Sequence, residues 1–65
     1  MPVITFEAAP LEKEQKRALV KGFTEVAAKV TGLPDAGFYV FLNENSLENV
    51  GVGGQLIDDR NGGSR

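Results

Sequence analysis

The sequence predicts an α+β fold in which a β-α-β unit is followed by a short C-terminal β-hairpin. Three observations predict it. A long amphipathic segment stands between two short apolar segments, the second apolar segment is uninterrupted, and a glycine pair follows near the end of the chain. The 65 residues suffice for one domain at most, so we expect a single domain over residues 1–65.

The first strand is expected at Val3–Ala8. Val3, Ile4 and Phe6 favour strands, and the polar residues between them give a partial period of two. The strand ends before Pro10, because proline suits a loop or the first turn of the helix that follows.

A helix is expected from Glu12 to about Thr31. Its apolar residues recur at intervals of three and four, which predicts one buried face; they are Leu19, Phe23, Val26 and Val30, with Val20 and Ala27 widening the stripe. No Ser, Thr, Asp or Asn begins the helix, so its N-cap is not evident from the sequence. Gly32 ends the helix and Pro34 prevents it from resuming.

The second strand is expected at Phe38–Leu42, where five apolar residues follow one another. A continuous run of this length is typical of a strand covered on both faces. The helix between the two strands allows a right-handed crossover into a parallel pair. One helix covers only one face of such a sheet, so the other face must meet another subunit.

A polar connection from Asn43 to Asn49 leads to a short hairpin at Val50–Ile57. Gly53-Gly54 is a suitable two-residue turn for it, and its exposed edges are expected to pair with a neighbouring chain. Residues 58–65 are polar and rich in glycine, so we expect a flexible tail or a segment that lies on a partner.

The composition excludes several classes of protein. The chain has no cysteine and no histidine, so it has no disulfide and no structural zinc site, and we expect no cofactor. The net charge is −2 with charges of both signs interspersed, which argues against nucleic-acid binding. No apolar run approaches the roughly 18 residues of a membrane span, and no signal peptide is visible. We therefore expect a soluble cytoplasmic protein that gains stability by oligomerising.

Pro2 is the most informative residue for function. If Met1 is removed, the nitrogen of Pro2 becomes a free secondary amine instead of an amide. A proline amide has neither a proton nor useful basicity, whereas the amine is a base whose pKa a folded environment can tune. The alternative is that Pro2 simply precedes a strand, at a position that needs no backbone donor.

Several segments, in their order along the chain, resemble the 4-oxalocrotonate tautomerase family. They are Pro2-Val3-Ile4, Glu14-Gln15-Lys16, Asn43-Glu44 and Gly51-Val52-Gly53-Gly54. The segment Asn49–Gly54 is similar to the DmpI-like subgroup. The likeness covers nearly the whole chain and implies the tautomerase, or MIF-like, fold. It also implies that two β-α-β units join into a four-stranded sheet in a dimer, and that three dimers form a hexamer.

The resemblance implies an isomerase that moves a proton between the enol and keto forms of a 2-hydroxydienoate or a pyruvate-type enol. The N-terminal proline of the family is the general base, which here is Pro2. Two arginines of the family bind the substrate carboxylate and polarise its 2-keto oxygen. This sequence has Pro10-Leu11-Glu12 where the first arginine falls, Tyr39 where the second falls, and Val50 where the family has an aromatic residue.

Four residues are candidates to replace the missing groups. The hydroxyl of Tyr39 could donate to a carbonyl oxygen, or its ring could pack at a subunit interface. Arg60 could reach a site from a neighbouring chain, or lie in solvent. Val50 and Phe38 could line an apolar wall, or fill the core.

Two other functions stay open at this point. A protonated Pro2 could act as a general acid in a hydration reaction that also needs a carboxylate, for which Glu7, Glu12 and Glu44 are available. Alternatively, the protein keeps the fold and the oligomer without catalysis, as a scaffold or a ligand-binding ring.

Overall fold

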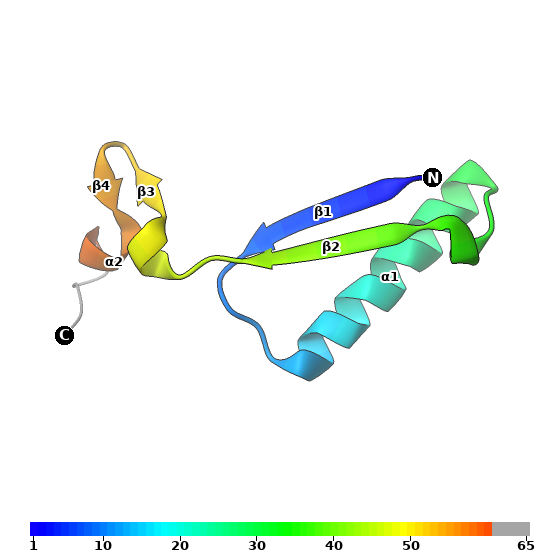
Figure 1. The fold of residues 1–65 in the computed structure, drawn as a ribbon, viewed down its shortest axis with the longest axis horizontal. Helices are drawn as coiled ribbons and strands as arrows, with labels where there is room; N and C mark the ends of the chain where they lie inside the picture. Colours follow the sequence, from blue (N-terminus) through cyan, green and yellow to red (C-terminus); the bar gives the residue numbers. More distant parts are fainter. Residues whose placement is uncertain (61–65) are drawn as a thin grey trace.

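The computed structural model describes residues 1–60 and confirms the predicted α+β class (Figure 1). A parallel β-α-β unit comes first and a two-stranded antiparallel hairpin follows it. In chain order the elements are β1 (Val3–Ala8), α1 (Lys13–Thr31), the 3-10 turn η1 (Asp35–Gly37), β2 (Tyr39–Glu44), the 3-10 turn η2 (Leu47–Asn49), β3 (Gly51–Val52), β4 (Gln55–Leu56) and α2 (Ile57–Arg60).

Strands β1 and β2 pair in parallel over their whole length, from Val3 opposite Tyr39 to Ala8 opposite Glu44. Strand β1 has the predicted bounds. Strand β2 begins at Tyr39 rather than at Phe38, because the N–H of Phe38 is used to close η1 on the carbonyl of Asp35 at 3.1 Å. It continues past Leu42 because its polar end still pairs with β1.

Both ends of α1 are closed by local hydrogen bonds. At its start the backbone N–H of Glu12 donates to Oε1 of Gln15 at 2.8 Å, which is half of a capping box that was not expected from the sequence. At its end Gly32 adopts a φ of 78°, and its N–H donates to the carbonyl of Ala28 at 2.8 Å. This left-handed residue is the helix stop that the sequence predicted.

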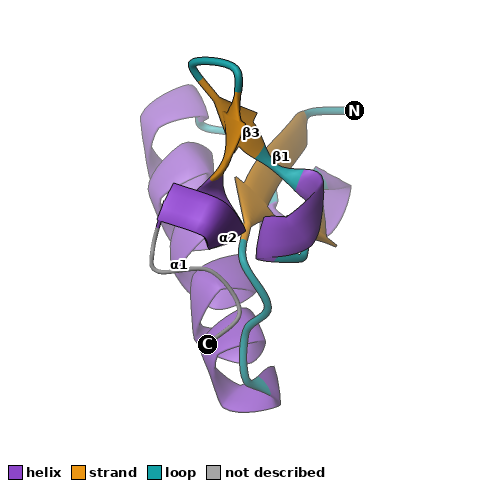
Figure 2. Ribbon diagram, turned by 90° about the vertical axis from the view of Figure 1, so that its left-hand side faces the viewer, coloured by secondary structure: helices purple, strands orange, loops and turns teal. Residues whose placement is uncertain are grey.

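Helix α1 covers one face of the β1–β2 sheet, as both views show (Figures 1 and 2). The rings of Phe6 and Phe23 meet there with their centroids 5.3 Å apart. The predicted buried stripe is wrong for three of its residues, because Val20, Val26 and Val30 are 38%, 65% and 79% exposed. A sheet of two strands is narrower than this stripe, so part of the helix face extends beyond it.

The other face of the sheet is open. Val3, Tyr39 and Phe41 stand on it and are 48%, 50% and 50% exposed. Within one protomer β2 is thus covered on one face only, as expected with a single helix, and cover of its other face by another subunit stays a prediction. No side chain among residues 1–60 is fully buried, so the described part of a single chain holds no closed core.

The hairpin extends away from the β-α-β unit as an arm (Figure 1). Its turn is Gly53-Gly54, with φ angles of 63° and 85°, as a type I′ turn requires. The chain measures 46 × 25 × 14 Å, and its radius of gyration is 15.5 Å. A compact chain of this length has a radius of gyration of about 11 Å, so the protomer is unusually extended.

A helical turn, α2, follows the hairpin at Ile57–Arg60, so the first residues of the expected tail at 58–65 are helical. The N–H of Ile57 donates to the carbonyl of Val50 at 2.9 Å, which closes the base of the hairpin as α2 begins. Asp58 and Asp59 lie in the first turn of α2, where acidic side chains suit the helix dipole. The rest of the expected tail, residues 61–65, lies outside the described residues. Within residues 1–60 no helix is long and apolar enough to cross a membrane.

Candidate active site

Pro2 lies just before β1 and is held at the start of the sheet. Its carbonyl oxygen accepts a hydrogen bond of 3.1 Å from the backbone N–H of Tyr39. Pro2 is half-buried, and Met1 before it is 81% exposed. Removal of Met1 would therefore cost little packing and would leave the nitrogen of Pro2 at the surface of the fold.

A hollow of about 390 Å³ opens beside Pro2. This volume is within the range of about 300–1,000 Å³ that is usual for small-molecule sites. Two separate parts of the chain meet around it, the N-terminus and the segment from the end of α1 to the start of β2. The residues that line it are Met1, Pro2, Leu33, Pro34, Ala36, Gly37 and Tyr39. The turn at Gly32 makes this meeting possible, because it directs the chain from the end of α1 back to the first residue of β2.

Of the five residues named from the sequence, Pro2 and Tyr39 are brought together. The side chain of Tyr39 is half-exposed and lines the same hollow as Pro2. Its phenol can donate a hydrogen bond to an oxygen bound there. The contribution of residues 33–37 was not expected from the sequence, although the Gly32-Leu33-Pro34 break just before β2 is a signal that could have found it.

Phe38, Val50 and Arg60 do not line this hollow. Phe38 is half-buried at the end of η1. Val50 lines a separate hollow of about 210 Å³ at the other end of β1, together with Glu7 and Ile57. Arg60 is exposed on α2. The arm that carries Val50 and Arg60 leaves from the carboxyl end of β2, whereas Pro2 stands at the amino end of the parallel strand β1.

The three carboxylates considered for water activation are used elsewhere in the protomer. Oε2 and Oε1 of Glu7 accept hydrogen bonds from Asn43 at 2.7 Å and Asn45 at 2.9 Å. These two bonds, the one from Asn43 first, lower the pKa of Glu7. Glu7 lies about 17 Å from Pro2 along the extended strand.

Glu44 fixes the loop that leads into α1. Its Oε2 accepts the backbone N–H of Leu11 at 2.8 Å and pairs with Nζ of Lys16 at 3.0 Å. The hydrogen bond from Leu11 and then the contact with Lys16 lower the pKa of Glu44. Glu12 serves as the N-cap of α1. None of the three carboxylates lines the hollow at Pro2.

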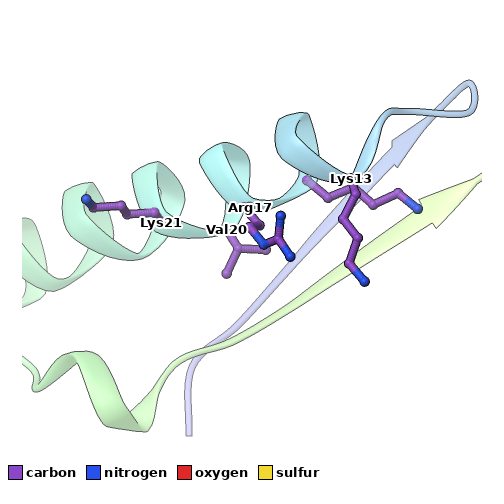
Figure 3. Close-up of a pocket in the computed structure, with 5 residues that line it drawn as sticks. Lys13, Arg17, Val20 and Lys21 are labelled. Carbon is purple, nitrogen blue, oxygen red and sulfur yellow. The ribbon is translucent and has the colours of Figure 1, made fainter.

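A second hollow of about 380 Å³ runs along the first half of α1 (Figure 3). It is an open groove between side chains of one helix, and the residues that line it are Lys13, Lys16, Arg17, Val20 and Lys21. Arg17 pairs with Glu14 and Lys16 pairs with Glu44. The groove is bordered by side chains of a single helix, whereas the hollow at Pro2 joins two parts of the chain, so we locate the candidate site at Pro2.

Known proteins resemble this chain in sequence and in fold. A family described as "Tautomerase enzyme" matches residues 2–60. A protein from Bacillus cereus named "Probable tautomerase" is 33% identical over 61 residues, which cover 92% of this chain and 100% of that protein.

Solved structures of tautomerase homologues have the same fold as this chain. The crystal structure of DmpI from Archaeoglobus fulgidus is 38% identical and has a TM-score of 0.79, and the match covers 86% of this chain and 97% of that one. The structure of TomN, a 4-oxalocrotonate tautomerase homologue in the tomaymycin biosynthetic pathway, has a TM-score of 0.89 over 98% of this chain and 100% of that one. TomN is only 23% identical, so it supports the fold alone. The family match covers most of the chain and the B. cereus relative matches along its whole length, and the chain therefore belongs to the tautomerase family.

Proposed function

We propose that this tautomerase uses Pro2, freed by removal of Met1, as its general base. The reaction moves a proton between the enol and keto forms of a 2-hydroxydienoate or a pyruvate-type enol. The observation that carries the proposal is that Pro2 and Tyr39 line one hollow of small-molecule size.

The proton transfer needs no cofactor. The lone pair of the Pro2 amine takes the proton of the enol hydroxyl, which leaves an enolate and a protonated amine. The enolate then forms its C=O bond while its carbon takes a proton from the protonated amine, which restores the neutral base. The phenol of Tyr39 stabilises the negative charge on the enolate oxygen by donating a hydrogen bond to it.

The surroundings of Pro2 suit this role. The walls of the hollow are mostly apolar, being formed by Leu33, Pro34 and Ala36. Apolar surroundings disfavour the charged form of an amine and so move its pKa toward neutral pH. A base is most effective when its pKa is close to the pH at which it works.

We also propose that the active protein is a hexamer built from three dimers. Each dimer would join two β1–β2 sheets, and other dimers would cover the open face that carries Val3, Tyr39 and Phe41. The extended protomer and its lack of a closed core within residues 1–60 support this assembly. Arg60 and Val50, on the arm, would then reach sites of neighbouring chains.

The experiment compares the wild-type protein with Pro2→Ala, using the enols of phenylpyruvate and 2-hydroxymuconate as substrates. Intact mass first establishes that Met1 is absent from both proteins. We expect the rate to fall at least about a hundredfold in the variant, as is usual when a general base is lost. An unchanged rate in Pro2→Ala would favour the alternative, an oligomer that binds ligands without catalysis.

A further inference from the structure

Leu33 is the largest side chain that the connection between α1 and β2 contributes to the hollow at Pro2. It is 46% exposed in the protomer, so part of its surface packs on the chain and part can contact a bound molecule. An apolar group of a substrate that lies against this leucine leaves water, and the burial of both surfaces favours binding.

The hydroxyl of Thr31 holds Leu33 in place. Oγ1 of Thr31 accepts a hydrogen bond of 3.2 Å from the backbone N–H of Leu33. The same hydroxyl donates to the carbonyl of Ala27 at 2.8 Å, which ties it to the last turn of α1. Gly32 lies between the two residues with a φ of 78°, and a glycine by itself would let this joint bend. The hydroxyl therefore restrains the direction in which the chain leaves the helix, although Thr31 does not line the hollow.

The path from Leu33 to the proposed base is short and hydrogen-bonded. The N–H of Gly37 donates to the carbonyl of Pro34 at 3.0 Å, which closes the first turn after Leu33. The N–H of Tyr39 then donates to the carbonyl of Pro2 at 3.1 Å. These backbone bonds set the position of the leucine relative to the Pro2 nitrogen, across a hollow of about 390 Å³.

We infer that Leu33 determines substrate specificity and that Thr31 positions it. Leu33 contacts an apolar substituent on the carbon that receives the proton, while Pro2 transfers the proton at the same hollow. The preferred substrates are therefore enols whose reacting carbon carries an aryl or branched alkyl group. This inference rests on the proposed function, because it assigns the substrate class of the Pro2 site.

The kinetic test uses the enols of phenylpyruvate and of pyruvate, which differ by one phenyl group. Leu33→Ala should lower the ratio of kcat/KM for the phenyl substrate over the small one by about tenfold, chiefly through KM. Val30→Ala is the matched control, because it shortens a nearby apolar side chain that does not line the hollow, and it should keep the wild-type ratio. An unchanged ratio in Leu33→Ala overturns the inference.

The positioning role of Thr31 is tested by two substitutions. Thr31→Val keeps the shape and removes the hydroxyl, and should lower the same ratio by about threefold with kcat unchanged. Thr31→Ser keeps both hydrogen bonds and should keep the wild-type ratio. In Leu33→Ala, Thr31→Val should have no further effect on the ratio, because the two residues act through one contact. A full effect of Thr31→Val in that background overturns the positioning role.

A binding measurement separates this inference from the proposed catalysis. The probes are 3-phenylpropanoate and propanoate, which do not react, and the readout is a methyl NMR titration. The phenyl probe should shift the Leu33 methyl signals and bind at least about tenfold tighter than propanoate, and Leu33→Ala should abolish this preference. That result supports the inference even if Pro2→Ala retains full activity, which would contradict the proposed base alone.

Unshifted Leu33 signals, or a preference that survives in Leu33→Ala, overturn the inference whatever the kinetics show. Light scattering completes the test, and we expect Leu33→Ala to have the same mass as the wild type. A smaller mass overturns the inference as well, because the leucine would then pack on another chain instead of the substrate.

Discussion

The backbone N–H of Tyr39 donates a hydrogen bond of 3.1 Å to the carbonyl oxygen of Pro2. This bond joins the first residue of β2 to the residue before β1, and it does not involve either side chain. The position of Pro2 is therefore independent of the phenol of Tyr39. The two proposed roles, base and hydrogen-bond donor, can be tested separately.

Tyr39→Phe should lower kcat about a hundredfold, because it removes a donor to the developing enolate oxygen and keeps the ring. The backbone hydrogen bond to Pro2 remains, so the melting temperature should stay close to that of the wild type. Steady-state kinetics and circular dichroism on the same preparations check both expectations. An unchanged kcat would mean that the ring of Tyr39 only packs at this position.

Phe41→Glu should disrupt the assembly. Phe41 stands on the open face of the sheet and is 50% exposed in the protomer, so a carboxylate there would be buried without a partner in the proposed oligomer. Light scattering after size exclusion should give about six times the 7.0 kDa protomer mass for the wild type and a much smaller mass for the variant. Lys29→Glu, on the exposed part of α1, is the matched control and should keep the wild-type mass. An intact hexamer in Phe41→Glu would show that this face lies in solvent.

Glu7→Gln should weaken the dependence of stability on acid pH. The hydrogen bonds from Asn43 and Asn45 hold the pKa of Glu7 below its ordinary value of 4.5. A carboxylate with a lowered folded-state pKa stabilises the protein above its unfolded-state pKa, and this stabilisation is lost as pH falls through the folded-state pKa. Melting temperatures between pH 7 and about pH 3, at fixed protein concentration, should therefore fall less steeply in Glu7→Gln.

Glu25→Gln, exposed on α1, is the control for that series and should follow the wild-type curve. Glu44 has a lowered pKa as well, so some acid sensitivity should remain in Glu7→Gln. Parallel curves for the wild type and Glu7→Gln would show that the two amide contacts do not discriminate between the charged and neutral carboxyl.

Two glycine substitutions should have opposite effects on stability. Gly54 has a φ of 85° in the hairpin turn, and an alanine there costs about 1–2 kcal/mol of backbone strain. Gly22 lies inside α1. Apart from its chain neighbours and the surrounding backbone of the helix, no atom of the described chain lies within 4 Å of the position that an added methyl group would take. Gly22→Ala should therefore stabilise the protein by about 0.5–1 kcal/mol. Urea unfolding of both variants measures the difference, and destabilisation by Gly22→Ala would indicate that another chain packs against the helix there.

Much of the fold could be predicted because the local signals agree. The β1 residues, the helix stop at Gly32 and the turn at Gly53-Gly54 follow from strand propensity and backbone conformation, which act within a few residues. The extent of β2 could not be predicted in this way. Its end at Glu44 depends on pairing with Ala8, a contact between residues far apart in the sequence.

The burial pattern of α1 was predicted less well for a similar reason. A periodic stripe indicates which side chains share a helix face, but not how wide the surface is that covers them. Val26 and Val30 belong to the stripe and remain exposed, because the sheet of one protomer has only two strands in the β-α-β unit.

Within the candidate site, Pro2 was recognised by its chemistry and Tyr39 by its place in a family pattern. The wall formed by Leu33, Pro34 and Ala36 carries no functional group that a sequence could reveal. It is recognised only when the chain folds back from α1 to β2. The placement of Val50 and Arg60 away from Pro2 likewise follows from the direction of the strands, which separates the arm from Pro2.

The measurement that tests the central claim most directly compares two forms of the wild-type sequence. One form is produced so that Met1 is removed, the other with methionine aminopeptidase inhibited so that Met1 stays, and intact mass verifies each. All side chains from Pro2 onward are identical, and only the nitrogen of Pro2 changes from amine to amide. The account predicts that kcat/KM for the enol of phenylpyruvate is at least about a hundredfold lower when Met1 is retained. Equal rates for the two forms would contradict it.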